Sequence, residues 1–368
     1  MDYDQRLLLY LVRVGLNPAT EPAPFEFSEI PDWKRIIKES TSHGVISIAF
    51  DGFNSLINRN IIPEQCMPER KIKVSWALNV YRQENIFKRQ FTIAAQVADE
   101  FAKHGVRTAV LKGTAIALLY PEPTHRPCGD FDCFLLGDYE KGNVIAEQMG
   151  AEVSRYYYKH SHIIYKKLTI ENHQFCTLIR GRKQNKVFER KLQDLLCKEE
   201  LQSIRKTNLL APTPMFNALF LTAHAWGHFL LEGIKLRHVT DWSVFLEKCV
   251  DQIDWQEFKN IITARDKKMF LFAESFSIIA HKYFGSPLPD VFDYSKDADT
   301  RSEKVIASMF EKQNNHYGQC YGYWKGRYMM IKNSIAANWK YKEFSEYGVL
   351  SNSLNNIVSF IVERHPHL

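Results

Sequence analysis

Two aspartates separated by one residue, Asp130 and Asp132, carry the most specific chemistry in this sequence. They lead into the apolar run Cys133 to Leu136, which predicts a buried strand. Because side chains alternate between the two faces of a sheet, both carboxylates should point to the same side. Two adjacent carboxylates repel each other unless a cation lies between them, and paired oxygen ligands suit Mg²⁺ or Mn²⁺. The pair therefore predicts a divalent-metal site.

A glycine turn upstream of the aspartates predicts a phosphate site. Val106 to Leu111 has the apolar, β-branched character of a short strand, and a short helix follows the turn. The turn consists of Lys112, Gly113 and Thr114. Backbone N–H groups in such a turn and at the start of a helix can bind phosphate. Lys112 and the later Arg126 add positive charge, so the stretch holds the parts that phosphoryl or nucleotidyl transfer requires.

The aspartate pair has a simpler interpretation when it is taken alone. An Asp-x-Asp at the start of a strand usually caps a turn or faces solvent, so the motif by itself is a weak signal. The ordered combination is more specific, because a Lys-Gly-Thr turn after a strand, an arginine in a loop and Asp-x-Asp before a strand must all coincide.

This order of residues resembles the DNA-polymerase-β-like nucleotidyltransferase superfamily, in which a Gly-Ser turn precedes Asp-x-Asp and a later third carboxylate. It is more closely similar to the uncharacterised nucleotidyltransferase family, whose members read Leu-Lys-Gly, Arg, Asp-x-Asp and a Glu-x-His strand. The resemblance covers roughly residues 30 to 250, and the pattern falls here on Leu111-Lys112-Gly113, Arg126, Asp130-Phe131-Asp132 and Glu171-Asn172-His173. The turn departs from the wider superfamily, because Lys112-Gly113-Thr114 replaces Gly-Ser.

The resemblance implies a role for each of these residues. The three carboxylates would bind Mg²⁺ or Mn²⁺ and carry catalysis; they are Asp130, Asp132 and Glu171. The nucleotide would be bound by Lys112, Gly113, Thr114 and Arg126. The implied reaction is the metal-dependent transfer of NMP from an NTP such as ATP to an acceptor hydroxyl. The acceptor itself cannot be read from the sequence.

The strand that carries Glu171 belongs to an expected run of β-structure. Two aromatic-rich segments, Val153 to Lys159 and His162 to Lys166, predict an antiparallel hairpin turned at His160-Ser161. Leu168 to Leu178 is the next expected strand. Without the family pattern, Glu171 would be an exposed strand glutamate; with it, Glu171 is the expected third carboxylate.

Four polar residues lie on two expected helices further along the chain. His224 and His228 are four residues apart, but the sequence has no His-Glu-x-x-His and no His-Asp dipeptide. Buried histidines that bond to Asp or to the backbone are therefore the alternative to metal ligands. Arg237 and Asp241 are also four apart, which suits a helical ion pair. The family resemblance implies instead that His173, His224, Arg237 and Asp241 are further residues of the cleft.

The elements that must position these residues predict an α+β fold, a small mixed-sheet nucleotidyltransferase core embedded in helical regions. The expected division is a helical region at 1–104, the α/β core at 105–180 and a second helical region at 181–368. Lys71 to His104 has helical spacing of apolar residues and no Pro or Gly. Gly105 follows it as a helix-ending residue, so this helix should lead the chain into the core.

Composition is ordinary for a soluble globular protein, with 45% hydrophobic and 24% charged residues. The net charge of +6 favours an anionic substrate such as a nucleotide, without arguing for nucleic acid. Seven cysteines without a Cys-x-x-Cys pair suggest free thiols in a reducing cytoplasm. The N-terminal stretch reads neither as a signal peptide nor as a membrane span.

Three alternatives remain open from the sequence. Aromatic and basic residues interleave in 317–344, and such a segment can bind single-stranded nucleic acid, although a helical face packed on the core is the commoner explanation. Nucleic acid is therefore not the favoured partner. A metal-dependent phosphohydrolase would use the histidines, and a non-catalytic nucleotide-binding protein could share the fold. Glycine-rich loops of the kinase, ATPase and dinucleotide-binding types do not occur in the sequence.

Overall fold

The computed structural model describes residues 1–177, 182–231, 233–311 and 338–349, with Lys332, Ile335 and Ser351 described singly. Most of the aromatic-basic segment at 317–344 therefore lies outside the described residues. The described α-helices are α1 Tyr3–Leu16, α2 Trp33–Ser42, α3 Ile46–Asn58, α4 Arg70–Lys103, α5 Thr114–Ala117, α6 Tyr139–Gln148, α7 Lys183–Cys197, α8 Pro214–Leu231, α9 Leu236–Cys249, α10 Trp255–Arg265, α11 Lys267–Ile279, α12 Lys296–Phe310 and α14 Asn338–Phe344. The strands are β1 Thr108–Val110, β2 Phe131–Phe134, β3 Glu152–Ser154, β4 His160–Tyr165, β5 Leu168–His173, β6 Gln202–Ser203 and β7 Leu209–Ala211.

In the described part of the chain, seven strands form one mixed sheet in the order β3-β4-β5-β2-β1-β7-β6. Strand β2 is parallel to β5 and antiparallel to β1. The register of β2 and β5 places Asp132 opposite Glu171, and β4 places His162 on the other side of Glu171. The expected α+β class is confirmed, since helices surround a small mixed sheet. The division of the chain at 104 and 180 stays a prediction.

One face of the sheet is apolar and packs on helices. Cys133 of β2 and Ile170 of β5 belong to a buried core that also contains Phe101 of α4 and Ile145 of α6. Because residues alternate along a strand, the neighbours of these apolar residues point to the opposite face. Glu171 therefore points away from Ile170, and the carboxylates are left on the face that does not pack on α4.

The long helix α4 delivers the chain into the sheet through a defined end. Gly105 has a φ of +74°, a conformation that costs little for glycine. Its N–H donates to the carbonyl oxygen of Ala102, and the N–H of Val106 donates to that of Phe101, both at 2.9 Å. Val106 and Phe101 also share the core beneath the sheet. This pair of bonds and the apolar contact form a Schellman motif, so the chain leaves the helix in the direction of β1.

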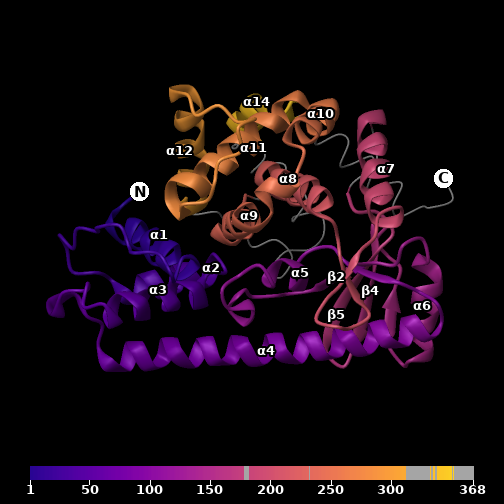
Figure 1. Cartoon of the computed structure of the whole chain (residues 1–368), viewed down its shortest axis with the longest axis horizontal. Helices are drawn as coiled ribbons and strands as arrows, with labels where there is room; N and C mark the ends of the chain where they lie inside the picture. Colours follow the sequence, from indigo (N-terminus) through magenta and orange to yellow (C-terminus); the bar gives the residue numbers. More distant parts are fainter. Residues whose placement is uncertain are drawn as a thin grey trace.

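The opposite side of the sheet faces the helices of the second half of the chain. In Figure 1, α4 runs along the lower edge of the molecule below both the N-terminal helices and the sheet. Helices α8 and α9 lie on the other side, between the sheet and helices α10 to α12. A larger core joins Leu111 and Phe134 of the sheet region to Phe229 of α8 and Phe245 of α9. The site residues from both halves can therefore meet between the sheet and α8–α9.

The predicted antiparallel pairing is confirmed, but the turn at His160-Ser161 is wrong. Strands β3 and β4 pair antiparallel, and both residues lie inside β4. A second tight turn, at Lys166 and Lys167, connects β4 to β5. These lysines have φ values of 47° and 63°, as in a type I′ turn, which normally uses Asn, Asp or Gly. His160 and His162 therefore lie on one strand, beside Glu171.

The surface and the helices give two further observations. Among the described helices, none combines the length and hydrophobicity that a membrane span needs.

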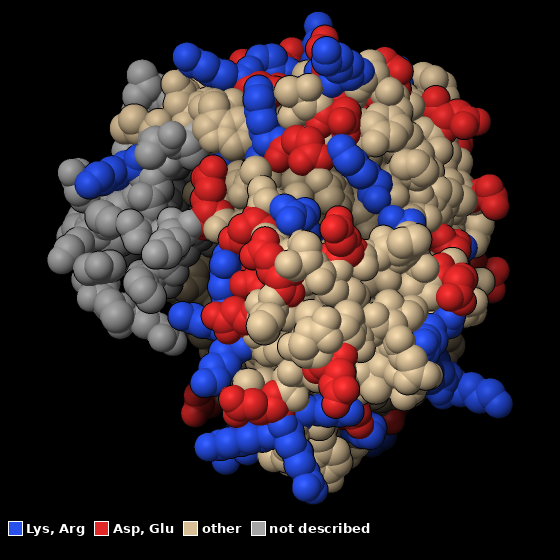
Figure 2. Space-filling view, turned by 90° about the vertical axis from the view of Figure 1, so that its left-hand side faces the viewer, with Lys and Arg blue, Asp and Glu red and all other residues tan. Residues whose placement is uncertain are grey.

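On the face drawn in Figure 2, the described lysines and arginines are interspersed with acidic residues. This pattern differs from the basic stripe that nucleic-acid-binding surfaces typically present.

Burial of His43 gives the fold a pH-dependent contribution. The centroids of the His43 and Phe310 rings are 5.0 Å apart, and the N–H of Leu236 donates to Nδ1 of His43 at 3.4 Å. Burial, with a smaller effect of the Lys235 charge, lowers the pKa of His43 from 6.5 to about 4. The unfolded chain therefore binds this proton at higher pH than the folded chain does. The folded state should lose stability as pH falls from about 6.5 to about 4.

We expect His43→Gln to reduce this loss of stability. One pKa unit corresponds to about 1.4 kcal/mol, so the effect should reach up to about 3 kcal/mol. Denaturant unfolding of both proteins at pH values between 7 and 4 measures it. Parallel stability curves for the two proteins over that range would show that His43 does not contribute.

Candidate active site

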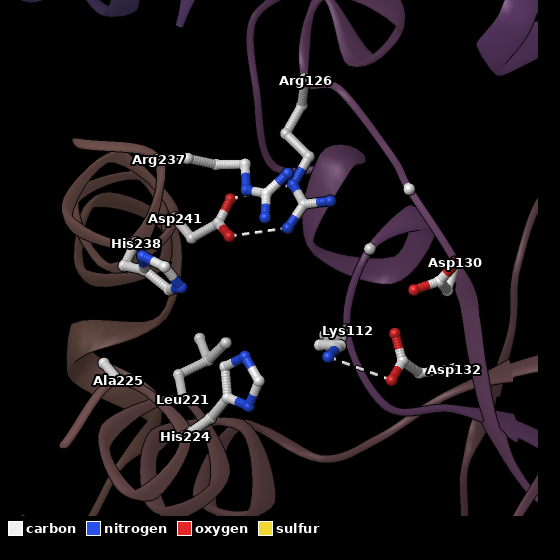
Figure 3. A pocket seen from close by; sticks show the side chains of 12 residues that line it. Lys112, Arg126, Asp130, Asp132, Leu221, His224, Ala225, Arg237, His238 and Asp241 are labelled. Atoms are coloured by element: carbon white, nitrogen blue, oxygen red, sulfur yellow. Dashed lines mark hydrogen bonds and ion pairs between the residues drawn. The ribbon is translucent and has the colours of Figure 1, made fainter. Parts of the chain in front are cut away.

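Two of the three predicted carboxylates line one cavity, and the third, Glu171, lies opposite Asp132 on the neighbouring strand. Asp130 and Asp132 line a cavity of about 120 Å³, drawn in Figure 3. Nε2 of His173 lies 3.1 Å from Oδ1 of Asp132 and 3.3 Å from Oε2 of Glu171. Asp132 and Glu171 thus share one imidazole at the edge of the cavity, as expected for side chains opposed on parallel strands.

The electrostatics of these carboxylates differ. Burial first, and then the charges of Glu171 and Asp132, raise the pKa of Asp130. Burial alone would raise the pKa of Asp132 too, but the Lys112 charge and the hydrogen bond from His173 outweigh it and lower that pKa. Within the described residues, the Asp130 carboxylate has no hydrogen-bond or ion-pair partner. Asp130 is therefore the carboxylate that a bound cation would stabilise most.

The predicted phosphate turn reaches the cavity through two of its three residues. Lys112 and Gly113 line the cavity, whereas Thr114 is buried and is not among the lining residues. Nζ of Lys112 lies 3.0 Å from Oδ1 of Asp132, so Lys112 neutralises that carboxylate in this structure. Gly113 has a φ of 61°, which favours glycine at the turn. The helix that follows is only four residues long.

Arg126 lies in the cavity wall but is paired with Asp241. Its Nε donates to Oδ1 at 3.0 Å and its Nη2 donates to Oδ2 at 2.7 Å, a bidentate ion pair. The hydroxyl of Tyr120 donates to the same Oδ1 at 2.7 Å. Both partners of the ion pair are buried. Arg126 therefore ties the loop before β2 to helix α9, and its assignment to nucleotide binding stays a prediction.

Arg237 lines the same cavity but takes no part in the ion pair between Arg126 and Asp241. The sequence suggested a helical ion pair of Arg237 with Asp241, but Asp241 bonds to Arg126 instead. Among the described residues, no hydrogen bond or ion pair engages the Arg237 guanidinium. Burial, and then the nearby charge of Arg126, lower its pKa. A half-buried arginine that lines a cavity without a carboxylate partner is suited to bind an anion.

Two histidines at this site were not predicted as site residues. Nε2 of His160 and Nε2 of His162 lie 3.7 and 3.6 Å from Oε1 of Glu171. Burial lowers the pKa of His160 to about 4, so its imidazole is neutral near pH 7. The alternation His-Ser-His could have indicated a shared strand face, but the misplaced hairpin turn concealed it. His160, His162 and His173 now surround one edge of Glu171.

The donor set around Glu171 fits a divalent ion. Ligand atoms of His160, Glu171 and His173 lie within 4.8 Å of one another. Carboxylate oxygens from Asp130, Asp132 and Glu171 are the hard ligands that Mg²⁺ prefers, and imidazole nitrogens are donors that Mn²⁺ accepts. The residues present therefore match the kind of ion that the sequence analysis expects.

Helices α8 and α9 form the other wall of the cavity. His224 of α8 and His238 of α9 line it together with Arg237 and Asp241. Figure 3 shows this wall opposite Lys112, Asp130 and Asp132. The structure thus brings His224, Arg237 and Asp241, which were predicted as cleft residues, to the same cavity as the aspartate pair. His238 was missed, because no spacing in the sequence connects it to His224.

Comparison with known proteins identifies the family. No curated protein and no solved structure matches the chain. A family model described as uncharacterised nucleotidyltransferase matches residues 30–285, more than half of the 368 residues. The match includes every residue predicted for the site. The chain therefore belongs to the uncharacterised nucleotidyltransferase family and is a transferase enzyme with a nucleotide substrate.

Proposed function

We propose that this enzyme transfers NMP from an NTP to a hydroxyl-bearing acceptor in a Mg²⁺-dependent reaction. The observation that carries the proposal is the geometry of the cavity. Asp130 and Asp132 stand on one wall with Glu171 beside them, and Arg237, which has no ion-pair partner among the described residues, stands on the other. A carboxylate cluster facing a cation is the arrangement that binds a metal–nucleotide complex.

The carboxylates have the metal-binding role in this proposal. Asp130, Asp132 and Glu171 would hold one or two divalent ions. An ion bound there offsets phosphate charge and lowers the pKa of an acceptor hydroxyl. Burial acts to raise the pKa of Glu171, but the hydrogen bond from His173 opposes it and the pKa is lowered overall. Glu171 is therefore ionised near pH 7 and can serve as a ligand or as a general base.

The cations have the phosphate-binding role. Arg237 lines the cavity without a carboxylate partner among the described residues, so it can bind a phosphate without breaking an ion pair. Lys112 is next to Asp132 and would bind the phosphoryl oxygen closest to that carboxylate. Both cations would offset the charge that grows on phosphoryl oxygens as the transition state forms. Arg126 would orient Arg237 by holding Asp241 away from it.

Removing the charge of Arg237 should weaken nucleotide binding. We expect Arg237→Met to raise the Kd for Mg²⁺–ATP by at least ~10-fold, about 1.4 kcal/mol, because a phosphate loses a charge-assisted hydrogen bond. Isothermal titration calorimetry of wild type and variant with Mg²⁺–ATP measures the two Kd values. The matched control is Arg82→Met, because Arg82 is an exposed arginine of α4 outside the cavity lining. Equal Kd values for Arg237→Met and wild type would remove Arg237 from the phosphate site.

A further inference from the structure

Three histidines in the wall opposite the carboxylates form a cluster that the proposed reaction does not use. His224 and His228 are one helical turn apart on α8, and His238 is on α9. The three residues present ring nitrogens that lie within 4.8 Å of one another. The ring centroids of His224 and His228 are 4.4 Å apart. The ring centroid of His238 lies 5.9 Å from that of His224 and 5.5 Å from that of His228. All three are half-buried.

The geometry is close to that of a metal site. Zinc–nitrogen bonds of about 2.1 Å place tetrahedral ligands about 3.4 Å apart. Small rotations of side chains that border a cavity would bring the three nitrogens to that spacing. His224 lines the 120 Å³ cavity and also a second one of about 220 Å³, so its ring has room to rotate.

His238 and His224 differ in their hydrogen bonds within the described part of the chain. The N–H of Lys235 donates to Nδ1 of His238 at 3.0 Å, and the same nitrogen lies 3.3 Å from the carbonyl oxygen of Lys235. A metal on Nε2 would require the tautomer that carries its proton on Nδ1, and this proton could be donated to that carbonyl, which is the usual support of a metal-binding histidine. For His224, the described residues provide no hydrogen-bond partner, so the alternative of a histidine satisfied by Asp or backbone is not observed.

We propose that His224, His228 and His238 bind a Zn²⁺ ion in the wall of the active-site cavity. Among the described residues the cluster consists of three imidazoles, a donor set for Zn²⁺ rather than for Mg²⁺, which separates this site from the aspartate pair. Three protein ligands leave a fourth tetrahedral position open. Since His224 and His238 line the cavity, an oxygen or nitrogen atom of a bound substrate can occupy that position. The site does not depend on the reaction proposed above.

The test is a metal titration of the full chain after its metals have been removed with EDTA. Co²⁺ serves as the probe, because tetrahedral Co²⁺ absorbs visible light strongly, and Zn²⁺ competes for it. The titration is made in the Glu171→Gln variant, which removes the shared carboxylate from the donor set of His160, Glu171 and His173. We expect one equivalent of Co²⁺ to produce the band and one equivalent of Zn²⁺ to remove it.

Loss of one ligand should weaken this binding strongly. His224→Gln and His238→Gln, each added to Glu171→Gln, should lower Co²⁺ affinity by at least ~100-fold, because losing even an outer partner typically costs 10- to 100-fold. His104→Gln is the control, because His104 is an exposed histidine outside the cluster. The same substitutions in the otherwise unmodified chain should remove one equivalent of calorimetric Zn²⁺ binding. A band that survives both substitutions, or no band in Glu171→Gln with a native circular dichroism spectrum, would overturn the site.

Discussion

Asp130→Asn and Asp132→Asn should each lower Mg²⁺-dependent turnover by at least ~1000-fold, about 4 kcal/mol of transition-state stabilisation. Each substitution removes a charged oxygen ligand from the cluster on which metal binding depends. The two variants should differ in stability, however. Asp130 has no partner among the described residues and its pKa is raised by burial and by Glu171 and Asp132, so Asp130→Asn relieves repulsion. Asp132→Asn leaves Lys112 and His173 without their shared carboxylate.

Calorimetric titration with Mg²⁺ and thermal unfolding, made on the same samples, separate the two effects. The matched control is Asp290→Asn, because Asp290 is an exposed aspartate away from the cavity. We expect Asp130→Asn to melt at or above the wild-type temperature in the absence of metal and to lose metal affinity. Wild-type metal affinity in both variants would show that the aspartate pair is not the metal site.

Asp241→Asn should destabilise the fold by about 3–5 kcal/mol, the usual cost of breaking a buried ion pair by removing one partner. The carboxylate accepts two hydrogen bonds from Arg126 and one from Tyr120, and all of these groups are buried. When the charge of Asp241 is removed, the guanidinium of Arg126 stays buried beside that of Arg237 with no anion between them. Denaturant unfolding measures the loss.

Two further variants make this test specific. Thr240→Val removes only the neighbouring hydroxyl, which bonds to Tyr120 at 2.9 Å, and should cost about 1 kcal/mol. The double change Arg126→Met with Asp241→Leu removes both charges and should be less destabilising than Asp241→Asn alone. If Asp241→Asn unfolds at the wild-type denaturant concentration, the ion pair does not hold the loop to α9.

The parts of the fold that follow local rules could be predicted from the sequence. Helix α4 is predicted by its spacing and by the absence of Pro and Gly, and Gly105 ends it with the expected left-handed conformation. The shared face of Asp132 and Glu171 follows from alternation along two strands, although only the family pattern indicated that these strands are neighbours. Local geometry thus accounts for the carboxylate side of the cavity.

The rest of the site depends on contacts that leave no local signal. Arg126 and Asp241 are 115 residues apart, and nothing near either residue indicates the ion pair. The two histidines of β4 were missed because the turn was placed at His160-Ser161, whereas β4 begins at His160. Both errors arise because tertiary contacts decide the structure at these positions. The structure therefore makes Arg237, rather than Arg126, the cation that can bind phosphate, and it adds His160 and His162 to the residues near Glu171.

In the proposed reaction, the bond between the α- and β-phosphates of the nucleotide breaks. This cleavage is tested by incubating the wild-type chain with Mg²⁺ and with ATP labelled at either the α- or the γ-phosphate. Candidate acceptors are offered as separate fractions of small molecules, protein and RNA, and Asp132→Asn is the control enzyme. We expect the α label to move to one fraction and the γ label to leave as pyrophosphate, with wild type only. Release of the γ label as orthophosphate, or binding of ATP with neither label moving in any fraction, would contradict NMP transfer by this enzyme.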